Sequence, residues 1–304
     1  MEEPWIIETR RLSYTFAKAS EQTLFDINLQ VPRGSVYCFV GPNGAGKTTT
    51  LRLLLGLLRS QAGSIRIFGR DFFADRRKIL SQIGSFIEQP SLYEHLTGRQ
   101  NLEVYRLTYG RERSRIEEVL KITDILDAGN KLVRAYSLGM KQRLSIALAL
   151  LNDPEVLILD EPTNGLDPQG IVDMRVLIQE LSGTYGKTIL LSSHLLSEVE
   201  KVATHFGVLR GGKLQFQGTK SELMIRRSQN TVLRLETADV QKAMSALQER
   251  FETICLDETF VLVKHIAREQ VPELTRHLVA SGVGIYNIGL VHENFEETFF
   301  HLTT

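Results

Sequence analysis

One short segment limits what this chain can fold into more than any other. Residues 41–49 read Gly-Pro-Asn-Gly-Ala-Gly-Lys-Thr-Thr and fit the pattern G-x-x-x-x-G-K-[ST]. The fixed positions of that pattern are Gly41, Gly46, Lys47 and Thr48. An apolar, β-prone run at 36–40 precedes the segment, and a helix-prone run at 50–55 follows it. The sequence therefore predicts a glycine-rich turn that connects a buried strand to a helix.

A turn of this composition is suited to holding phosphate groups. Glycines have no Cβ, so the backbone can approach an anion closely, and N–H groups at the start of the helix point toward it. Lys47 would add positive charge at the outer phosphates, and the Thr48 hydroxyl can bind Mg²⁺. The residues expected to contact phosphate are Gly41, Pro42, Asn43, Gly44, Ala45, Gly46, Lys47, Thr48 and Thr49. A glycine-rich turn that binds nothing is disfavoured, because all fixed positions and both flanks fit.

The composition is that of an ordinary globular protein. The chain has 304 residues, 42% of them hydrophobic and 24% charged, so a full core and two domains are expected. Basic and acidic residues number 36 each, which gives no overall electrostatic reason to expect nucleic acid or a lipid surface as a partner. The two cysteines, Cys38 and Cys255, define neither a disulfide framework nor a zinc site.

The sequence carries no pattern of a secreted or membrane-spanning protein. Its first five residues, Met-Glu-Glu-Pro-Trp, lack the features of a signal peptide. The longest apolar stretch, near residues 51–58, is interrupted by Arg52 and Gly56 and is too short for a membrane span. We therefore expect a chain that does not cross a membrane and works in the cytoplasm.

The order of apolar runs and helical patterns predicts the domain organisation. Short apolar runs at 156–159 and 188–191 alternate with helical segments, which indicates a parallel sheet buried on both faces. A mostly helical region covers about 90–150. Near 220–230 the composition turns polar, and we place a linker there. The prediction is a domain of residues 1–225 followed by an α+β domain of residues 226–304, whose two β-α-β-like halves are compatible with a ferredoxin-like fold.

Two further segments carry candidate chemistry. The apolar run 156–159 ends in Asp160 and Glu161. A carboxylate at the end of a buried strand can hold Mg²⁺ through its water shell, and the next one can orient or deprotonate a water that attacks a phosphate. The alternative is an acidic turn without function. Ser137 precedes a helical run and is a plausible N-cap, which could be an ordinary capped helix or an anion site.

These motifs together resemble the nucleotide-binding subunit of an ABC transporter over roughly residues 5–225. Residues 136–143, Tyr-Ser-Leu-Gly-Met-Lys-Gln-Arg, are similar to the signature motif of that family, and residues 161–168 are similar to its acid pair running into the D-loop. Ser192-Ser193-His194 resembles the segment with the switch histidine. The resemblance implies an α/β fold of the P-loop NTPase type, with a mixed or parallel sheet core and a helical subdomain.

The resemblance also implies roles for single residues, with ATP and Mg²⁺ as ligands. Asp160 would support the metal together with Thr48, Glu161 would be the catalytic carboxylate, and His194 would contact the γ-phosphate. Ser137 and Gly139 would contact ATP bound to the opposite protomer of a dimer. Asp167 would join that dimer interface.

Two positions depart from the family pattern and leave alternatives open. The Q-loop glutamine aligns with Glu88, and Gln89 follows one place later. Either of them could face Mg²⁺ or the attacking water. For the aromatic ring that stacks on adenine, Phe16 is the first choice and Tyr14 the second, and each could equally be an ordinary core or surface aromatic.

Two other stretches are similar to a subfamily of exporters. Residues 93–102 resemble a stretch of the ATPases that serve ABC-2 type exporters, and residues 296–303 resemble the end of bacitracin-resistance and daunorubicin-resistance type ATPases. This implies a homodimer or paired ATPase subunit, bound to a separate integral membrane permease of the ABC-2 type at the inner face of the plasma membrane, and it indicates export.

A second hypothesis is an ABC ATPase that acts on ribosomes or DNA instead of a permease. The chain has one ATPase unit and no sustained heptad pattern, and its balanced charge gives no nucleic-acid footprint, so this class is disfavoured. A solitary P-loop kinase is disfavoured by the signature segment and by the paired acids.

Overall fold

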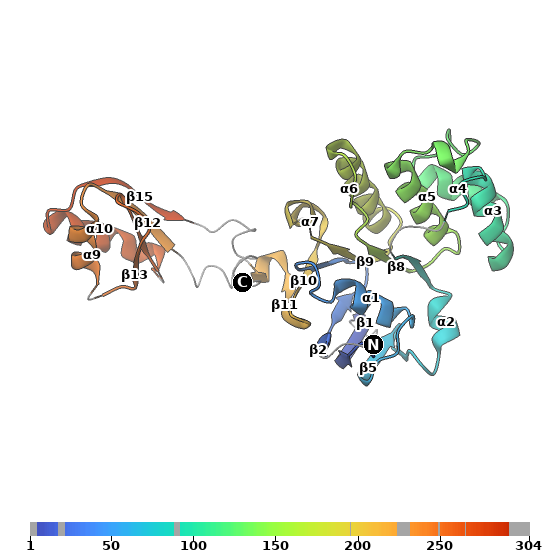
Figure 1. The fold of residues 1–304 in the computed structure, drawn as a ribbon, viewed down its shortest axis with the longest axis horizontal. Coiled ribbons are helices and arrows are strands. Elements are labelled where there is room, and N and C mark those ends of the chain that lie inside the picture. Colours follow the sequence, from blue (N-terminus) through green and yellow to red (C-terminus); the bar gives the residue numbers. More distant parts are fainter. Residues whose placement is uncertain are drawn as a thin grey trace. The chain divides into compact units, whose positions relative to one another are not determined.

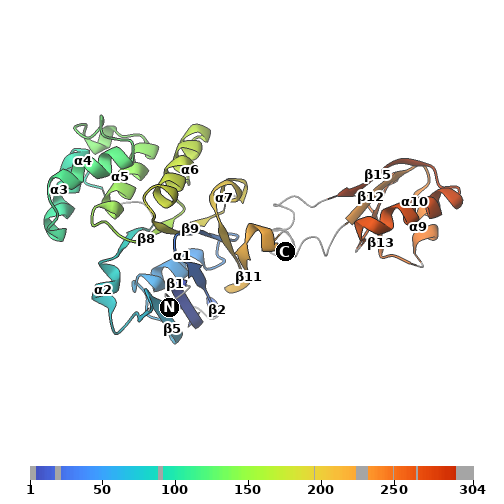
Figure 2. The ribbon, with the colours of Figure 1, turned by 180° about the vertical axis from the view of Figure 1, so that it is seen from behind.

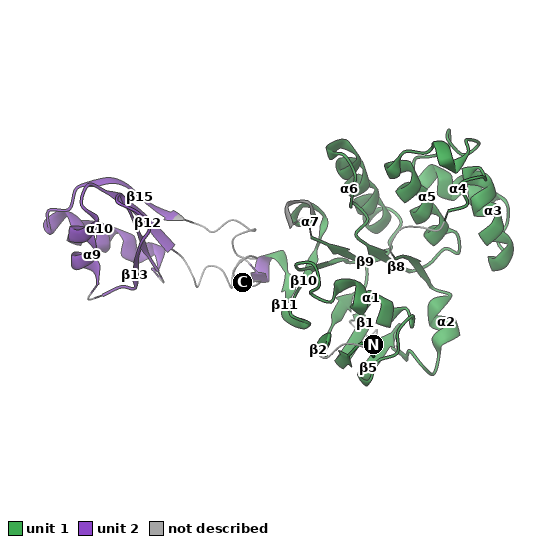
Figure 3. Cartoon of the chain, viewed as in Figure 1, with its two compact units in different colours: residues 1–220, 302–304 green, residues 221–301 purple. Residues whose placement is uncertain are grey.

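The computed structural model describes residues 5–17, 22–87, 92–194, 196–223, 232–248, 250–264 and 266–291. The chain divides into two compact units, residues 1–220 with 302–304 and residues 221–301 (Figure 3). The predicted domain boundary at 225/226 lies outside the described residues. Each unit has its own hydrophobic core, so each is described by itself.

The first unit begins with an antiparallel sheet in the order β2-β1-β5-β6, with β3 also paired to β1. Its strands are β1 (Trp5–Tyr14), β2 (Leu24–Ile27), β3 (Gln30–Pro32), β5 (Ala62–Ile67) and β6 (Arg70–Asp71). Side chains on one face of this sheet, such as Ile7 and Ile65, are completely buried. This face packs on the rest of the unit.

The second sheet is mixed, in the order β11-β10-β4-β9-β8-β7. Its strands are β4 (Val36–Val40), β7 (Ile83–Phe86), β8 (Val156–Asp160), β9 (Thr188–Ser193), β10 (His205–Arg210) and β11 (Lys213–Thr219). All neighbours are parallel except β10 and β11. Every residue of β4, β8 and β9 is buried, as expected for parallel strands covered on both faces.

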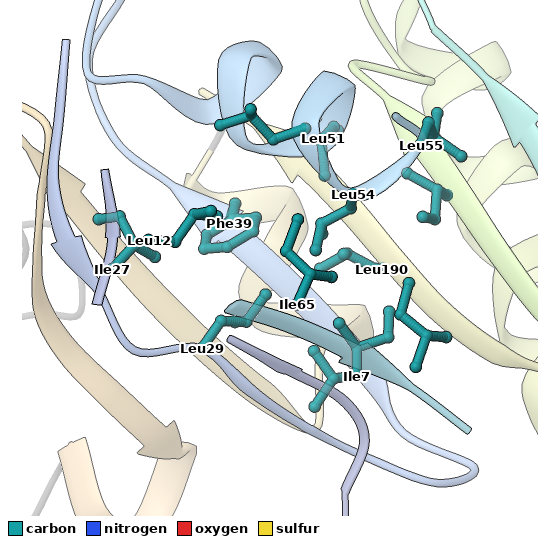
Figure 4. Packing of buried hydrophobic residues seen from close by; sticks show 14 of the residues in the cluster. Ile7, Leu12, Ile27, Leu29, Phe39, Leu51, Leu54, Leu55, Ile65 and Leu190 are labelled. Atoms are coloured by element: carbon teal, nitrogen blue, oxygen red, sulfur yellow. The ribbon is translucent and has the colours of Figure 1, made fainter. Parts of the chain in front are cut away.

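The core of the first unit lies where α1 (Lys47–Leu54) packs between the two sheets. Figure 4 shows Leu51 and Leu54 of this helix close to Phe39 of β4 and to Ile65 of the antiparallel sheet. All four side chains are fully buried. The helix that follows the glycine-rich loop is therefore fixed by apolar contacts with both sheets.

A helical region is inserted between β7 and β8, where helices were predicted (Figures 1 and 2). It contains α3 (Gly98–Tyr109), α4 (Ser114–Ile122), a 3-10 turn (Val133–Ala135) and α5 (Leu138–Leu150). Thr97 and Gln100 form a capping box at the start of α3. A Cβ on Gly84 of β7 would lie 2.2 Å from the backbone oxygen of Ala149, so only glycine lets α5 pack this closely on the sheet.

Three further helices are described in the first unit. They are α2 (Arg76–Leu80), α6 (Pro168–Gly183) and α7 (Leu196–Val202). Helix α6 begins at Asp167, whose carboxylate accepts the Gly170 N–H, and Pro168 stands at its first position. Among the helices in the described part of the chain, none combines the length and apolar character needed to cross a bilayer.

The second unit is an antiparallel four-stranded sheet in the order β13-β14-β12-β15. The elements follow as β12 (Val232–Thr237), α9 (Val240–Leu247), β13 (Thr253–Cys255), β14 (Phe260–Val263), α10 (Val271–Ala280) and β15 (Ile285–Val291), with a 3-10 turn at Arg268–Gln270. This β-α-β-β-α-β succession is the ferredoxin-like motif. Strand β13 was not predicted, because its three residues carry no alternation that stands out from the surrounding polar sequence.

The core of the second unit generates a prediction about separate stability. Leu235 of β12 is fully buried among residues of that unit. Leu235→Ala should lower the free energy of unfolding of this unit by about 2–5 kcal/mol, because it removes buried methyl groups and leaves a cavity. Hydrogen exchange during urea titration of the full chain measures the effect, with exposed Leu256→Ala in the same unit as the control. An equal loss of protection in residues 5–220 would contradict the separation of the two cores.

Candidate functional site

The glycine-rich loop runs from the end of β4 to the start of α1, as the sequence predicts. A Cβ at Gly41 would lie 2.3 Å from the Leu209 carbonyl oxygen. Gly46 has φ +104°, and a Cβ there would lie 2.4 Å from a Leu24 methyl group. Both positions therefore require glycine. Gly46 is also the N-cap of α1 and makes no side-chain cap, so the first N–H groups of the helix remain available to an anion.

Lys47 is buried and lies across the loop. Its ammonium group donates to the Gly41 carbonyl at 2.7 Å and to the Pro42 carbonyl at 3.4 Å. It also lies 3.5 Å from a carboxylate oxygen of Glu161. A buried cation held by neutral carbonyls can exchange these partners for phosphate oxygens with a gain in charge pairing.

Asp160, at the end of β8, joins the loop to the neighbouring strand. The Thr48 hydroxyl donates to its carboxylate, at 2.9 Å from the nearer oxygen, and the Ser192 hydroxyl of β9 donates to it at 2.5 Å. Asp160 is only 6% exposed. Because a buried carboxylate is costly unless it is hydrogen-bonded, these two hydroxyls are what keep Asp160 in place.

Glu161 follows directly and takes an unusual backbone conformation. Its φ is +47°, in the left-handed region that side chains other than glycine, asparagine and aspartate seldom adopt. The Glu161 N–H donates to the Ser192 hydroxyl at 2.9 Å, and its carboxylate lies 2.7 Å from Nδ1 of His194. The turn directs Glu161 toward Lys47 and His194, so the three charged or titratable groups converge on one point.

The strand that leads into the loop is buried along its whole length. Cys38 of this strand, β4, is completely buried. Burial raises the pKa of the Cys38 thiol well above its ordinary value, and the charge of Glu161 raises the pKa further, while Lys47 opposes the shift. Cys38 is therefore a neutral packing residue of the strand that leads into the loop.

The signature segment lies at the start of α5. Ser137 is the N-cap, and its hydroxyl accepts the Met140 N–H at 3.3 Å, so the predicted cap is confirmed. Ser137 and Leu138 are exposed. Within the described residues, neither Ser137 nor Gly139 forms a hydrogen bond with residues 41–49. The geometry leaves their outer surface open to a partner.

The start of α5 is joined to the segment between Glu161 and Asp167. The Gln142 amide donates to the Asn164 carbonyl at 3.0 Å. A Cβ at Gly165 would lie 3.0 Å from a Leu138 methyl group, and one at Gly139 would lie 3.5 Å from Leu166. The signature segment and the D-loop segment of one chain therefore form one connected surface.

A cavity of about 450 Å³ lies between this surface and the acids. Asp160 and Glu161 line it on the sheet side. On the helical side, Glu94 and Lys141 form an ion pair at 2.6 Å, which lowers the pKa of Glu94. Beside it, the buried side-chain amide oxygen of Gln142 (Oε1) has no hydrogen-bond partner within the described chain. Asp160 and Glu161 thus face a space large enough for water.

The remaining predicted site residues are the two candidate aromatic residues, the two Q-loop candidates and Asp167. Tyr14 is buried in the core, whereas Phe16 is 37% exposed and packs edge-to-face on it, so Phe16 has the more accessible ring. Glu88 and Gln89, the two candidates for the Q-loop position, lie outside the described residues. Asp167 is exposed and caps α6.

Sequence reasoning did not assign a role to Ser192 or Gln142. Ser192 is the last residue but one of β9, which pairs with β8, and Asp160 and Ser192 are direct partners in the register. A polar residue near the end of a buried apolar run could have indicated a partner for the acids that end the neighbouring strand. Gln142 gave no such signal, because an amide within a capped helix is ordinary.

The arrangement fits a nucleoside triphosphate and its metal. The loop presents unbonded helix N–H groups and a buried cation at one end, and the hydroxyl of Thr48 with the carboxylate of Asp160 offers the hard oxygen ligands that Mg²⁺ prefers. All of these groups lie at the carboxyl ends of parallel strands, where ligands of such sheets bind. The fold and site define a P-loop nucleotide-binding protein.

Comparison with known proteins gives the family. A family model described as ABC transporter matches residues 24–164. The bacitracin transport ATP-binding protein BcrA of Bacillus licheniformis is 38% identical over 302 residues, which cover 98% of this chain and 97% of that protein. The daunorubicin resistance ATP-binding protein DrrA3 of Streptomyces coeruleorubidus is 36% identical, over 93% and 92%.

A solved structure gives the same answer for the fold. That of cbiO1 from Clostridium perfringens, described as part of the ABC transporter complex cbiONQ, superposes with a TM-score of 0.67 at 28% identity and covers 74% of this chain and 94% of that one. The chain belongs to the family of ABC transporter ATP-binding proteins and is an ATPase. The resemblance seen in the sequence is confirmed, including its bacitracin and daunorubicin resistance types.

The hydroxyl of Ser192 generates a prediction. Ser192→Ala removes a donor to the buried Asp160 and the acceptor of the Glu161 N–H. It should cost about 1–3 kcal/mol of stability, because buried polar groups lose partners, and it should slow ATP hydrolysis. Urea unfolding and ATP turnover measure the two effects. Ser145→Ala, at a buried hydroxyl bonded within its own helix, is the control, and equal behaviour of the two variants would exclude a special role for Ser192.

Proposed function

We propose that this protein is the ATP-hydrolysing subunit of an ABC exporter, and that it works as a dimer bound to a separate membrane permease. The observation that carries the proposal is the convergence of Lys47, Glu161 and His194 beside the Thr48–Asp160 pair. Export is supported by the relatives, which are named for bacitracin transport and daunorubicin resistance and match nearly the whole chain.

Within one site, each residue has a separate task. Lys47 leaves the carbonyls of Gly41 and Pro42 and neutralises charge on the outer phosphates of ATP. Thr48 and Asp160 would hold Mg²⁺, which supplies further positive charge against the phosphate oxygens when bound. Most of the lowering of the barrier comes from such charge stabilisation, as in phosphoryl transfer generally.

Glu161 is the proposed general base. Its carboxylate takes a proton from the water that attacks the γ-phosphate. His194, whose Nδ1 lies 2.7 Å from that carboxylate, orients it and then contacts the phosphate. The left-handed backbone of Glu161 is held by the bond between its N–H and Ser192. Strain retained at one acid of a pair is typical of functional positions.

The exposed signature segment supports a dimer. Ser137 and Gly139 stand at the open N-terminus of α5, where an anion is favoured, and no bond joins them to residues 41–49 of the same described chain. We therefore propose that they bind ATP held by the loop of a second chain, with Asp167 at the interface. Two ATP sites would then form together.

The helical region is the proposed attachment site of the permease. It is inserted between β7 and β8 (Figure 1). Its helix α3 exposes Val104, Leu107 and Tyr109, which are 41%, 65% and 45% accessible. Apolar side chains grouped on an exposed helix are typical of surfaces that bind another protein. An ABC-2 type permease is the proposed partner, which would hold the protein at the inner face of the plasma membrane.

The role of Glu161 is tested by Glu161→Gln. The amide cannot accept the proton, so ATP hydrolysis should fall about 10²–10⁴-fold while ATP affinity is retained. Glu155→Gln makes the same change at the residue that directly precedes β8, whereas Glu161 directly follows β8, and it should leave turnover near that of the unchanged protein. Turnover close to normal in Glu161→Gln would show that another group acts as the base.

The transport function is tested by purification from native membranes. Tagged Glu161→Gln protein with ATP should bring down a multi-span membrane protein, because blocked hydrolysis retains the ATP-bound complex. Leu107→Ser should reduce that capture without changing ATP turnover in the isolated protein. Capture of ribosomal proteins or nucleic acid in place of a permease would overturn the transport function and favour the alternative ABC ATPase class.

A further inference from the structure

A basic surface with exposed apolar side chains lies on the first unit, away from the ATP site. Residues 52–80 contain seven arginines and lysines and two aspartates, although basic and acidic residues balance over the whole chain. The surface consists of Leu57, Arg59, Phe73, Arg76, Arg77 and Lys78, and we call it the α2 patch. All six side chains are exposed. The balance of the full sequence therefore hides a local excess of positive charge.

Hydrogen bonds build the α2 patch from two separate segments. The Arg76 guanidinium donates to the Gly56 carbonyl at 3.0 Å, which places α2 beside the end of α1. The carboxylate of Asp71 accepts the N–H groups of Phe73 and Ala74, both at 3.0 Å. This turn buries Phe72 completely and leaves the ring of Phe73 49% exposed. Phe73 is thus held outward by its own backbone.

Three cations of the α2 patch lack an acidic partner in the part of the chain that the structure describes. In the described ranges, no carboxylate forms an ion pair with Arg59, Arg77 or Lys78, and Leu57 beside them is 63% exposed. The two nearby acids are Asp71, whose carboxylate is bonded to the backbone, and the half-buried Asp75. Exposed aromatic and aliphatic side chains among unpaired cations are typical of surfaces that lie on anionic lipid.

The position of the α2 patch agrees with such a partner. Helix α2 directly precedes β7, the edge strand from which the chain continues into the helical region. In Figures 1 and 2, α2 lies toward α3 and far from β11 at the other edge of the sheet. The patch therefore borders the region to which we assign the permease. In that respect alone the inference rests on the proposed function, because a permease would bring this side close to the bilayer.

We propose that the α2 patch binds the anionic headgroups of a membrane. Arg59, Arg77 and Lys78 pair with lipid phosphates, and Phe73 and Leu57 enter the boundary between headgroups and acyl chains. This contact assists the permease in holding the ATPase against the membrane, and it exists without a permease. The lipid is defined by its negative charge and not by a particular headgroup.

Vesicle co-sedimentation of the full chain tests the proposal. The unchanged protein should bind phosphatidylcholine vesicles that contain phosphatidylglycerol and bind pure phosphatidylcholine vesicles much less, with the difference shrinking as salt is raised. Arg77→Glu with Lys78→Glu should weaken binding to the anionic vesicles at least about tenfold, since each basic residue near such a surface contributes measurably. Phe73→Ser should weaken the binding that persists in high salt.

Matched charge changes elsewhere provide the control. Arg268→Glu with Arg276→Glu alters the same number of exposed cations in the second unit and should leave vesicle binding unchanged. ATP turnover should be normal in all of these variants, which verifies folding. Equal binding to both kinds of vesicle, no binding to either, or equal losses in the two double variants would overturn the proposal.

A protein partner would give a different result. If the unchanged protein ignores anionic vesicles, and Arg77→Glu with Lys78→Glu loses a co-purifying permease in detergent, the α2 patch is a protein contact and the lipid proposal is wrong. The vesicle assay contains no permease. Anionic binding without any permease in the membrane purification would therefore support the α2 patch while overturning the transport function.

Discussion

The hydrogen-bonded carboxylate of Asp160 is the constraint on which the site depends. A carboxylate with so little exposure is stable only with donors, and here the donors come from two other elements, α1 and β9. Thr48 ties the phosphate loop to the acid strand, and Ser192 ties the acid strand to its neighbour. The same Ser192 hydroxyl accepts the backbone N–H of Glu161. One buried charge thus sets the position of the loop, of the Thr48 hydroxyl proposed to hold Mg²⁺, and of the proposed base.

Apolar packing holds the frame around that charge. Leu51 and Leu54 press α1 onto both sheets, and Gly84 lets α5 approach β7 until backbone meets backbone. Neither contact involves a group that reacts, yet both determine where the N-terminus of a helix is presented. The chemistry is therefore carried by the ends of elements whose sides are fixed by hydrophobic burial.

Much of this could be predicted from the sequence, for identifiable reasons. Residues 41–49 and the acids that end the run 156–159 have fixed spacing, and their neighbours have clear strand or helix character. The Ser137 cap was also predicted from residue type and position. Features that depend on contacts between distant segments were not. Ser192 meets Asp160 only because β9 pairs with β8, and Gln142 meets Asn164 only because α5 packs beside the D-loop segment.

Local sequence patterns also fail to predict very short elements and the solvent accessibility of single side chains. The three residues of β13 gain their strand conformation from pairing with β14. Which of Tyr14 and Phe16 has the accessible ring depends on the burial of each, which alignment of residue types does not give. The positive φ of Glu161 is likewise a property of the assembled site, because a glutamate by itself would prefer another backbone conformation.

The hydrogen bond between Gln142 and Asn164 connects two surfaces of the same chain. The first face is the start of α5, and the second is the stretch that leads from this chain's own acids toward Asp167. Leu138 also packs against Gly165, so we expect the two faces to move together as one rigid unit. In the proposed dimer, a displacement of one of these two faces would be transmitted to the other, so gain or loss of one nucleotide would change the contacts of the second.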